Sequence, residues 1–226
     1  MSAGHNTRLG IVLMVGTTFV FAVQDGLSLH LSSTYNVYMV VMVRYWFFAA
    51  FVITISAKQV GGIRNAARTH QPYLQGFRGV LLATEICVMV TGFTYLGLVE
   101  SLAIFSSYTL IVAAMSGPIL GEIVGWRRWM AIFAGLCGVL IILKPGMGVF
   151  SVYAIIPLIA ASMFALYSLL TRYVARQDST ATSFFWTGVT GCIVMTFVGM
   201  FHLEDMIPAD WLLMLCLCFT GATGHW

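Results

Sequence analysis

The sequence predicts an all-α membrane protein, a polytopic bundle of transmembrane helices. Hydrophobic residues make up 60% of the chain and charged residues only 8%, whereas about a quarter of the residues in a typical soluble domain are charged. So few charges cannot cover the surface of a water-soluble protein. Eight apolar segments, most of them near the roughly 20 residues that a helix needs to cross the hydrocarbon core, span residues 9–31, 37–56, 79–98, 102–121, 129–143, 153–171, 183–201 and 211–226.

The basic residues predict how these helices are oriented. With the N-terminus in the cytoplasm, nine of the eleven Lys and Arg residues fall on the cytoplasmic side, as the positive-inside rule requires. They are Arg8, Lys58, Arg64, Arg68, Arg78, Arg127, Arg128, Arg172 and Arg176. The net charge of +3 therefore reflects topology, and no nucleic-acid partner is expected. The longest connection, residues 57–77, is predicted to be a solvated cytoplasmic loop that touches anionic lipid.

Each of the first three segments carries an ionisable side chain inside the membrane: Asp25, Arg44 and Glu85. Such a group costs about 2.5–3.5 kcal/mol unless it is paired or hydrated. Asp25 and Arg44 lie at similar depths, roughly 9 Å and 10–12 Å from the outer surface at 1.5 Å per helical residue, so an ion pair is available to them. Two interpretations stay open. The pair locks the first helix against the second, or it lines a cavity and binds substrate.

Glu85 enters from the other side and lies roughly 10 Å from the cytoplasm. Burial among apolar residues would favour its protonated form, which makes Glu85 a candidate for proton coupling. The alternative is a carboxylate that lines a wet cytoplasmic vestibule.

The fourth and fifth segments are joined by a short basic turn. The fourth ends at Gly121-Glu122, with Pro118 just before, and the turn reads Gly125-Trp126-Arg127-Arg128-Trp129. Arginines bracketed by tryptophans are typical of a cytoplasmic membrane interface. Glu122 is interpreted as an interfacial ion-pair partner of the two arginines. The fifth segment ends at Lys144-Pro145-Gly146.

This succession of motifs within residues 100–146 resembles the EamA domain of the drug/metabolite transporter superfamily. One position departs from the family pattern, because Thr109 stands where the family commonly has a proline, thirteen residues before Glu122. The source of any kink in this helix is therefore open, and Pro118 is another candidate for it.

The resemblance implies ten helices in two inverted five-helix repeats. Residues 1–146 would form the first repeat, and residues 147–226 a partial second repeat with helices six to eight, so a C-terminally truncated transporter is expected. A weak internal repeat agrees, since Phe21-Ala22 and Phe164-Ala165 occupy similar places in the first and sixth segments.

Tyr108, Tyr167 and Trp186 lie among small or hydroxyl residues, as aromatic side chains in a wet cavity do, although plain helix packing accounts for each of them as well.

No motif of an enzyme, an ATP-binding element or a metal or cofactor site occurs, and the five cysteines lie in apolar runs without metal-ligand spacing. The predicted function is secondary transport, without ATP, of a small polar metabolite by alternating access across a bacterial inner membrane. The resemblance implies substrates such as amino acids, nucleotide-linked compounds, purines or S-adenosylmethionine. Direction, coupling ion and a homodimer stay open. The alternatives are a non-transporting membrane structural or partner protein and an inactive truncated fragment.

Overall fold

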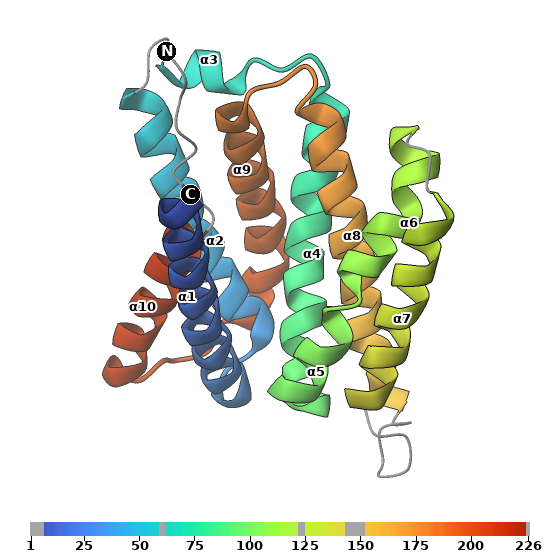
Figure 1. Ribbon diagram of the computed structural model, residues 1–226. Coiled ribbons are helices and arrows are strands. Elements are labelled where there is room, and N and C mark those ends of the chain that lie inside the picture. Colours follow the sequence, from blue (N-terminus) through green and yellow to red (C-terminus); the bar gives the residue numbers. More distant parts are fainter. Residues whose placement is uncertain (1–6, 59–61, 122–124, 143–151, 225–226) are drawn as a thin grey trace.

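Long helices that run side by side make up the protein, shown as a computed structural model in Figure 1. The structure describes residues 7–58, 62–121, 125–142 and 152–224, and these contain no β-strand. The longer helices are α1 (Thr7–Thr34), α2 (Val37–Lys58), α4 (Pro72–Leu96), α6 (Tyr108–Leu120), α7 (Trp126–Ile142), α8 (Ile155–Val174), α9 (Thr180–Gly199) and α10 (Pro208–Gly224). The shorter ones are α3 (Gly62–Ala67), α5 (Leu98–Phe105) and the 3₁₀ turns η1 (Val152–Ala154) and η2 (Met200–His202).

Within the described residues, five helical segments are long and apolar enough to cross a membrane. They are Val37–Lys58, Pro72–Leu96, Leu98–Leu120, Val152–Val174 and Thr180–His202, and Pro208–Ala222 is a shorter apolar helix. The predicted fold class, an all-α membrane bundle, is confirmed. The predicted loop 57–77 is wrong in two places, because α3 lies within it and α4 begins at Pro72 rather than at residue 79. Proline at the first helical position is favourable for such a start.

The predicted apolar segment 102–121 is found as Leu98–Leu120, but it begins earlier than predicted and is interrupted within its length. α5 begins after Gly97, whose φ of 101° lies in the region that favours glycine. A turn at Ser106 and Ser107 then separates α5 from α6, and Ser106 Oγ donates to the carbonyl of Ala103 (2.7 Å). Thr109 Oγ1 donates to the carbonyl of Ser106 (3.0 Å). Serine and threonine hydroxyls that bind nearby carbonyls compete with the helical pattern, so this break forms without a proline at position 109.

Five helix pairs have the most extensive packing in the described part of the bundle: α2 with α9, α4 with α8, α4 with α9, α1 with α10 and α6 with α8. Glycines allow the close approach of α9 to α2, because a Cβ built on Gly191 would lie 2.1 Å from Cε1 of Tyr45 and one on Gly199 would lie 2.7 Å from Cβ of Met42. Small residues at such interfaces are how membrane helices gain van der Waals contact. The same reason explains why the alanines of α8 are fully buried against α4 and its neighbours.

The two ends of the bundle differ in charge. At the basic end, α2 ends, α4 begins and α8 ends, and α3 lies across it (Figure 1). It carries Lys58, Arg64, Arg68, Arg172 and Arg176. Arg176 also donates to the carbonyl of Leu120 (3.2 Å), which places the end of α6 there. The acidic end holds the α1–α2 and α9–α10 connections, with Glu204, Asp205 and Asp210.

Candidate functional site

A cavity of about 280 Å³ lies between α1, α2, α4, α5, α6 and α8. Its volume is close to the lower end of the roughly 300–1,000 Å³ found for small-molecule sites. Polar side chains of α1, α2 and α4 form one part of its lining: Gln24, Asp25, Ser28, Arg44 and Glu85. The rest is apolar or aromatic: Phe21, Leu82, Ile86, Met89, Val90, Phe93, Leu102, Phe105, Tyr108 and Phe164.

The structure brings together four of the six residues that the sequence singled out, namely Asp25, Arg44, Glu85 and Tyr108. Arg44 is 9% exposed and Glu85 only 4%. In the described part of the chain, neither carboxylate lies within ion-pair distance of an arginine or lysine and neither accepts a hydrogen bond. The ion pair available to Asp25 and Arg44 is therefore not formed. The two side chains face a shared cavity instead.

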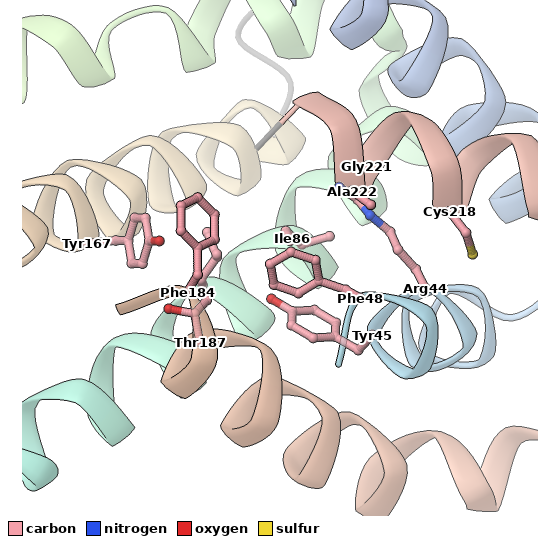
Figure 2. Close-up of a pocket in the computed structure, with 11 residues that line it drawn as sticks. Arg44, Tyr45, Phe48, Ile86, Tyr167, Phe184, Thr187, Cys218, Gly221 and Ala222 are labelled. Carbon is pink, nitrogen blue, oxygen red and sulfur yellow. The ribbon is translucent and has the colours of Figure 1, made fainter. Parts of the chain in front are cut away.

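Arg44 points towards α10, which explains why it does not reach Asp25. A Cβ built on Gly221 would lie 3.1 Å from Nε of Arg44, so the guanidinium rests against the backbone of α10, where a larger residue would be a tight fit. Figure 2 shows Arg44 extended towards Gly221 and Ala222, while Tyr45, Phe48 and Phe184 turn towards one another between α2 and α9. These residues line a second pocket of about 30 Å³, which is too small for a metabolite.

The aromatic part of the large cavity is a continuous wall, defined here as Phe105, Tyr108 and Phe164. Ring centroids are 5.3 Å apart for Phe105 and Tyr108, 5.4 Å for Phe105 and Phe164, and 4.9 Å for Tyr108 and Phe164, the last pair edge to face. The wall joins three helices, because its members come from α5, α6 and α8. Edge-to-face contacts of this kind fix ring orientation and stabilise the packing beyond plain burial.

The other two predicted residues lie elsewhere. Tyr167 lines the small pocket, and its ring lies under the guanidinium of Arg78, 5.0 Å from Cζ to the ring centroid. Trp186 lines neither pocket, and its Nε1 donates to the carbonyl of Ala67 (3.1 Å). This bond ties α3 to α9, so the polar partner of the indole is a backbone carbonyl rather than a cavity. Glu122, predicted to pair with Arg127 and Arg128, lies outside the described residues.

A buried network at the basic end was not expected from the sequence, which placed Arg78 among the basic residues of the cytoplasmic side, between the predicted loop 57–77 and the predicted helix 79–98. Arg78 is 1% exposed and Gln75 fully buried. Arg78 donates to Gln75 Oε1 through Nη1 and to Thr171 Oγ1 through Nε (3.1 Å) and Nη2 (2.8 Å). Because Thr171 belongs to α8, this network fixes the start of α4 to the end of α8. The sequence feature that could have indicated this network is the spacing of Gln75 and Arg78, which places the two side chains one helical turn apart.

Asp178, in the α8–α9 connection, completes this arrangement. It accepts hydrogen bonds from Thr69 Oγ1, from the backbone N–H of His70 (3.0 Å) and from Gln75 Nε2 (2.9 Å). Burial raises the pKa of the Asp178 carboxyl, but these hydrogen bonds to the charged form outweigh it, so the pKa lies below its ordinary value. We call this set, Thr69, His70, Gln75 and Asp178, the basic-end latch.

The lowered pKa of Asp178 predicts how stability depends on pH. Its contribution is complete above the unfolded-state pKa of about 3.9 and is lost as the pH falls through the lower folded-state pKa. Asp178→Asn should therefore melt at a lower temperature than the parent, by a constant margin from pH 7 to pH 5. Below about pH 4 the margin should shrink. Thermal unfolding of the purified protein across this range measures it, and a margin that widens towards acid pH would contradict the prediction.

A second hydrogen-bonded set closes the acidic end. Tyr35 Oη donates to Asp210 Oδ2 (2.7 Å) and accepts from the backbone N–H of Ile207 (3.3 Å). The N–H of Asn36 donates to Glu204 Oε2 (3.0 Å). The hydrogen bond to Asp210 raises the pKa of Tyr35. This acidic-end latch, Tyr35, Asn36, Glu204 and Asp210, ties the α1–α2 connection to the α9–α10 connection.

A polytopic helical membrane protein with an internal polar cavity is the class that this fold and site define. The chain belongs to the EamA-like transporter family, which matches residues 8–144, more than half of its length. This confirms the family that the motifs of residues 100–146 indicated.

The curated relatives described below are bacterial transporters of small molecules. The chain is 26% identical over 183 residues to a riboflavin transporter of Vibrio cholerae, a match that covers 80% of this chain and 61% of the relative. It is 22% identical over 191 residues to an S-adenosylmethionine uptake transporter of Rickettsia prowazekii, covering 84% and 64%. A riboflavin transporter of Brucella anthropi is 29% identical over 143 residues, covering 63% and 50%. The chain thus spans less than two thirds of the length of these relatives. No solved structure gives a significant match.

Proposed function

We propose that this protein is a secondary transporter that moves a small polar metabolite with a heteroaromatic ring through the large cavity. The observation that carries the proposal is the set of buried ionisable side chains at the cavity. Asp25, Arg44 and Glu85 form no close ion pair among the described residues, although Arg44 attracts both carboxyl groups electrostatically. Placing such groups inside a membrane costs about 2.5–3.5 kcal/mol each, which is typical of a functional site. The names of the relatives support a heteroaromatic ring in the substrate, because riboflavin and S-adenosylmethionine both contain a fused heteroaromatic system.

Alternating access is supported by the way the helices pair. If α1, α2 and α4 correspond to α8, α9 and α10, the contact of α4 with α8 has its counterpart in α10 with α1. The contact of α4 with α9 has its counterpart in α10 with α2, and α2 pairs with its own counterpart α9. This is the pattern expected of inverted repeats, with residues 1–146 as one unit and residues from 147 as the other. Phe21 and Phe164, the pair that marks the weak sequence repeat, both line the cavity.

The two latches follow the same correspondence. At the basic end, the α8–α9 connection binds the start of α4 through Asp178, and at the acidic end the α1–α2 connection binds the start of α10 through Tyr35. Tyr35 and Asp178 are separated by the same number of residues as Phe21 and Phe164. Each latch would have to open for the cavity to reach one side of the membrane. By the positive-inside rule, the basic end faces the cytoplasm of the bacterial cell.

Uptake by reconstituted protein tests this proposal. Proteoliposomes with the protein should accumulate radiolabelled riboflavin or S-adenosylmethionine in a saturable way, without ATP. Cysteine pairs placed at Asn36 and Glu204, or at His70 and Asp178, should stop uptake when oxidised and restore it on reduction. The matched control is a cysteine pair at the exposed positions Arg64 and Arg68. Accumulation that continues at the parent rate with either latch cross-linked would refute alternating access through these gates.

A further inference from the structure

The large cavity contains more acid than base. Among the described residues that line it, two carboxylates, Asp25 and Glu85, face one guanidinium, that of Arg44. Arg44 is also the residue drawn away towards α10, where it lines the small pocket as well. The part of the lining built by α1 and α4 is therefore an acidic face.

The polar groups of this face are incompletely paired within the protein. Glu85 is only 4% exposed and lines the cavity, and among the described residues it forms no hydrogen bond and no ion pair, its nearest basic group being the more distant Arg44. The neighbouring Gln24 is also buried, and its Oε1 is enclosed without a partner. Buried acceptors left unpaired cost about 1–3 kcal/mol each, so a ligand that supplies donors or positive charge would relieve this cost.

The aromatic wall lies in the same cavity as the acidic face. Phe105, Tyr108 and Phe164 contact one another at interplanar angles of 40°, 50° and 89°, so they form one cluster of tilted rings at the cavity. Aromatic faces attract cations through the ring quadrupole, by about 2 kcal/mol or more when the pair is desolvated. The same faces bind flat rings by stacking.

We infer that the cavity selects organic cations that carry a flat aromatic or heteroaromatic ring, with the positive charge against Asp25 and Glu85 and the ring on the aromatic wall. The inference rests on the proposed function and narrows its substrate class. It disfavours anions such as nucleotide phosphates, because a phosphate would face two carboxylates with only Arg44 to neutralise it. Among the two metabolites of the relatives, it favours the sulfonium S-adenosylmethionine over the uncharged riboflavin.

Binding rather than uptake tests the inference, so that it stands or falls separately from transport. Isothermal titration of the protein in nanodiscs at pH 7 compares S-adenosylmethionine with S-adenosylhomocysteine, which lacks only the methyl group and its positive charge. Benzyltrimethylammonium and tetramethylammonium form a second pair that differs in the ring. We expect the Kd of S-adenosylmethionine to be at least about tenfold lower than that of S-adenosylhomocysteine. The Kd of benzyltrimethylammonium should likewise be at least about tenfold lower than that of tetramethylammonium. A tenfold ratio corresponds to ~1.4 kcal/mol.

Variants assign the effect to residues. Glu85→Gln and Asp25→Asn should each reduce the preference for S-adenosylmethionine over S-adenosylhomocysteine, while Phe164→Leu should weaken both ligands and leave the preference. Glu100→Gln, an exposed carboxylate at the start of α5, is the matched control and should change nothing. Equal affinity for the two adenosyl ligands, or no binding of either benzyltrimethylammonium or S-adenosylmethionine, overturns the inference. If Glu85→Gln abolishes uptake but keeps the ligand preference, Glu85 is a proton site and its assignment here fails.

If the nanodisc protein prefers the cations but proteoliposomes show no uptake, the cavity inference stands and the transport proposal fails. If the protein takes up riboflavin in a saturable way but binds the two adenosyl ligands with equal affinity, the transport proposal stands and the cavity inference fails.

Discussion

Arg44→Ala is expected to reduce uptake by at least about tenfold and to lower the free energy of unfolding by about 2.5–3.5 kcal/mol, the cost of an uncompensated charge inside a membrane. The reason is that Arg44 is the one basic side chain among the described residues lining the large cavity, and its loss leaves Asp25 and Glu85 facing the same space. Titration with sodium dodecyl sulfate, followed by circular dichroism in mixed micelles, measures the stability, and proteoliposome uptake measures the activity.

Two further variants distinguish the effect of the cavity charges on stability from their effect on uptake. Asp25→Asn combined with Arg44→Ala should recover part of the stability, because the remaining charge is smaller, without recovering uptake. Arg64→Ala removes an exposed arginine of α3 and should leave both quantities unchanged. If Arg44→Ala retains the parent's stability and uptake, the cavity charges have neither a structural nor a functional role.

Arg78→Ala is expected to lower the free energy of unfolding by about 3–5 kcal/mol. Truncating a fully buried large side chain costs about 2–5 kcal/mol, and the change also removes the donor to the buried Gln75 Oε1, which adds about 1–3 kcal/mol if the amide finds no new partner. Partial relaxation of the site keeps the total below the sum of the two terms. The same denaturant titration measures the loss.

The conservative variant Arg78→Lys distinguishes the network from simple charge. Lysine keeps a cation near the Tyr167 ring but cannot bind Gln75 and Thr171 at once with a planar fork. Its stability should therefore lie between that of the parent and that of Arg78→Ala. Arg68→Ala, at an exposed position directly after α3, is the control. A loss no larger for Arg78→Ala than for Arg68→Ala would contradict the burial and bonding of Arg78.

The ionisable part of the candidate site could be predicted from the sequence. Asp25, Arg44 and Glu85 stood out because charged groups inside long apolar segments are rare, and their depths along the helices agreed. The aromatic wall could not be predicted in this way. Phe105 and Phe164 are two among 16 phenylalanines, and no feature of the sequence separates a ring that lines a cavity from one that faces lipid. Trp186 shows the same limit, because its partner is a backbone carbonyl in α3.

The sequence by itself determined the class of the protein, the approximate positions of its apolar segments and the family, because apolar length and charge distribution act locally and need no partner. The tertiary structure decided what each polar group binds. From the sequence, Arg78 is predicted to be a cation on the cytoplasmic side, yet it is buried. Its guanidinium binds Gln75 of α4 and Thr171 of α8 and lies over the ring of Tyr167. Asp25 and Arg44 were free to pair, yet they face a cavity, because Gly221 of α10 leaves room for the guanidinium elsewhere. Such choices depend on contacts between helices far apart in the chain, and these exist only once the bundle has formed.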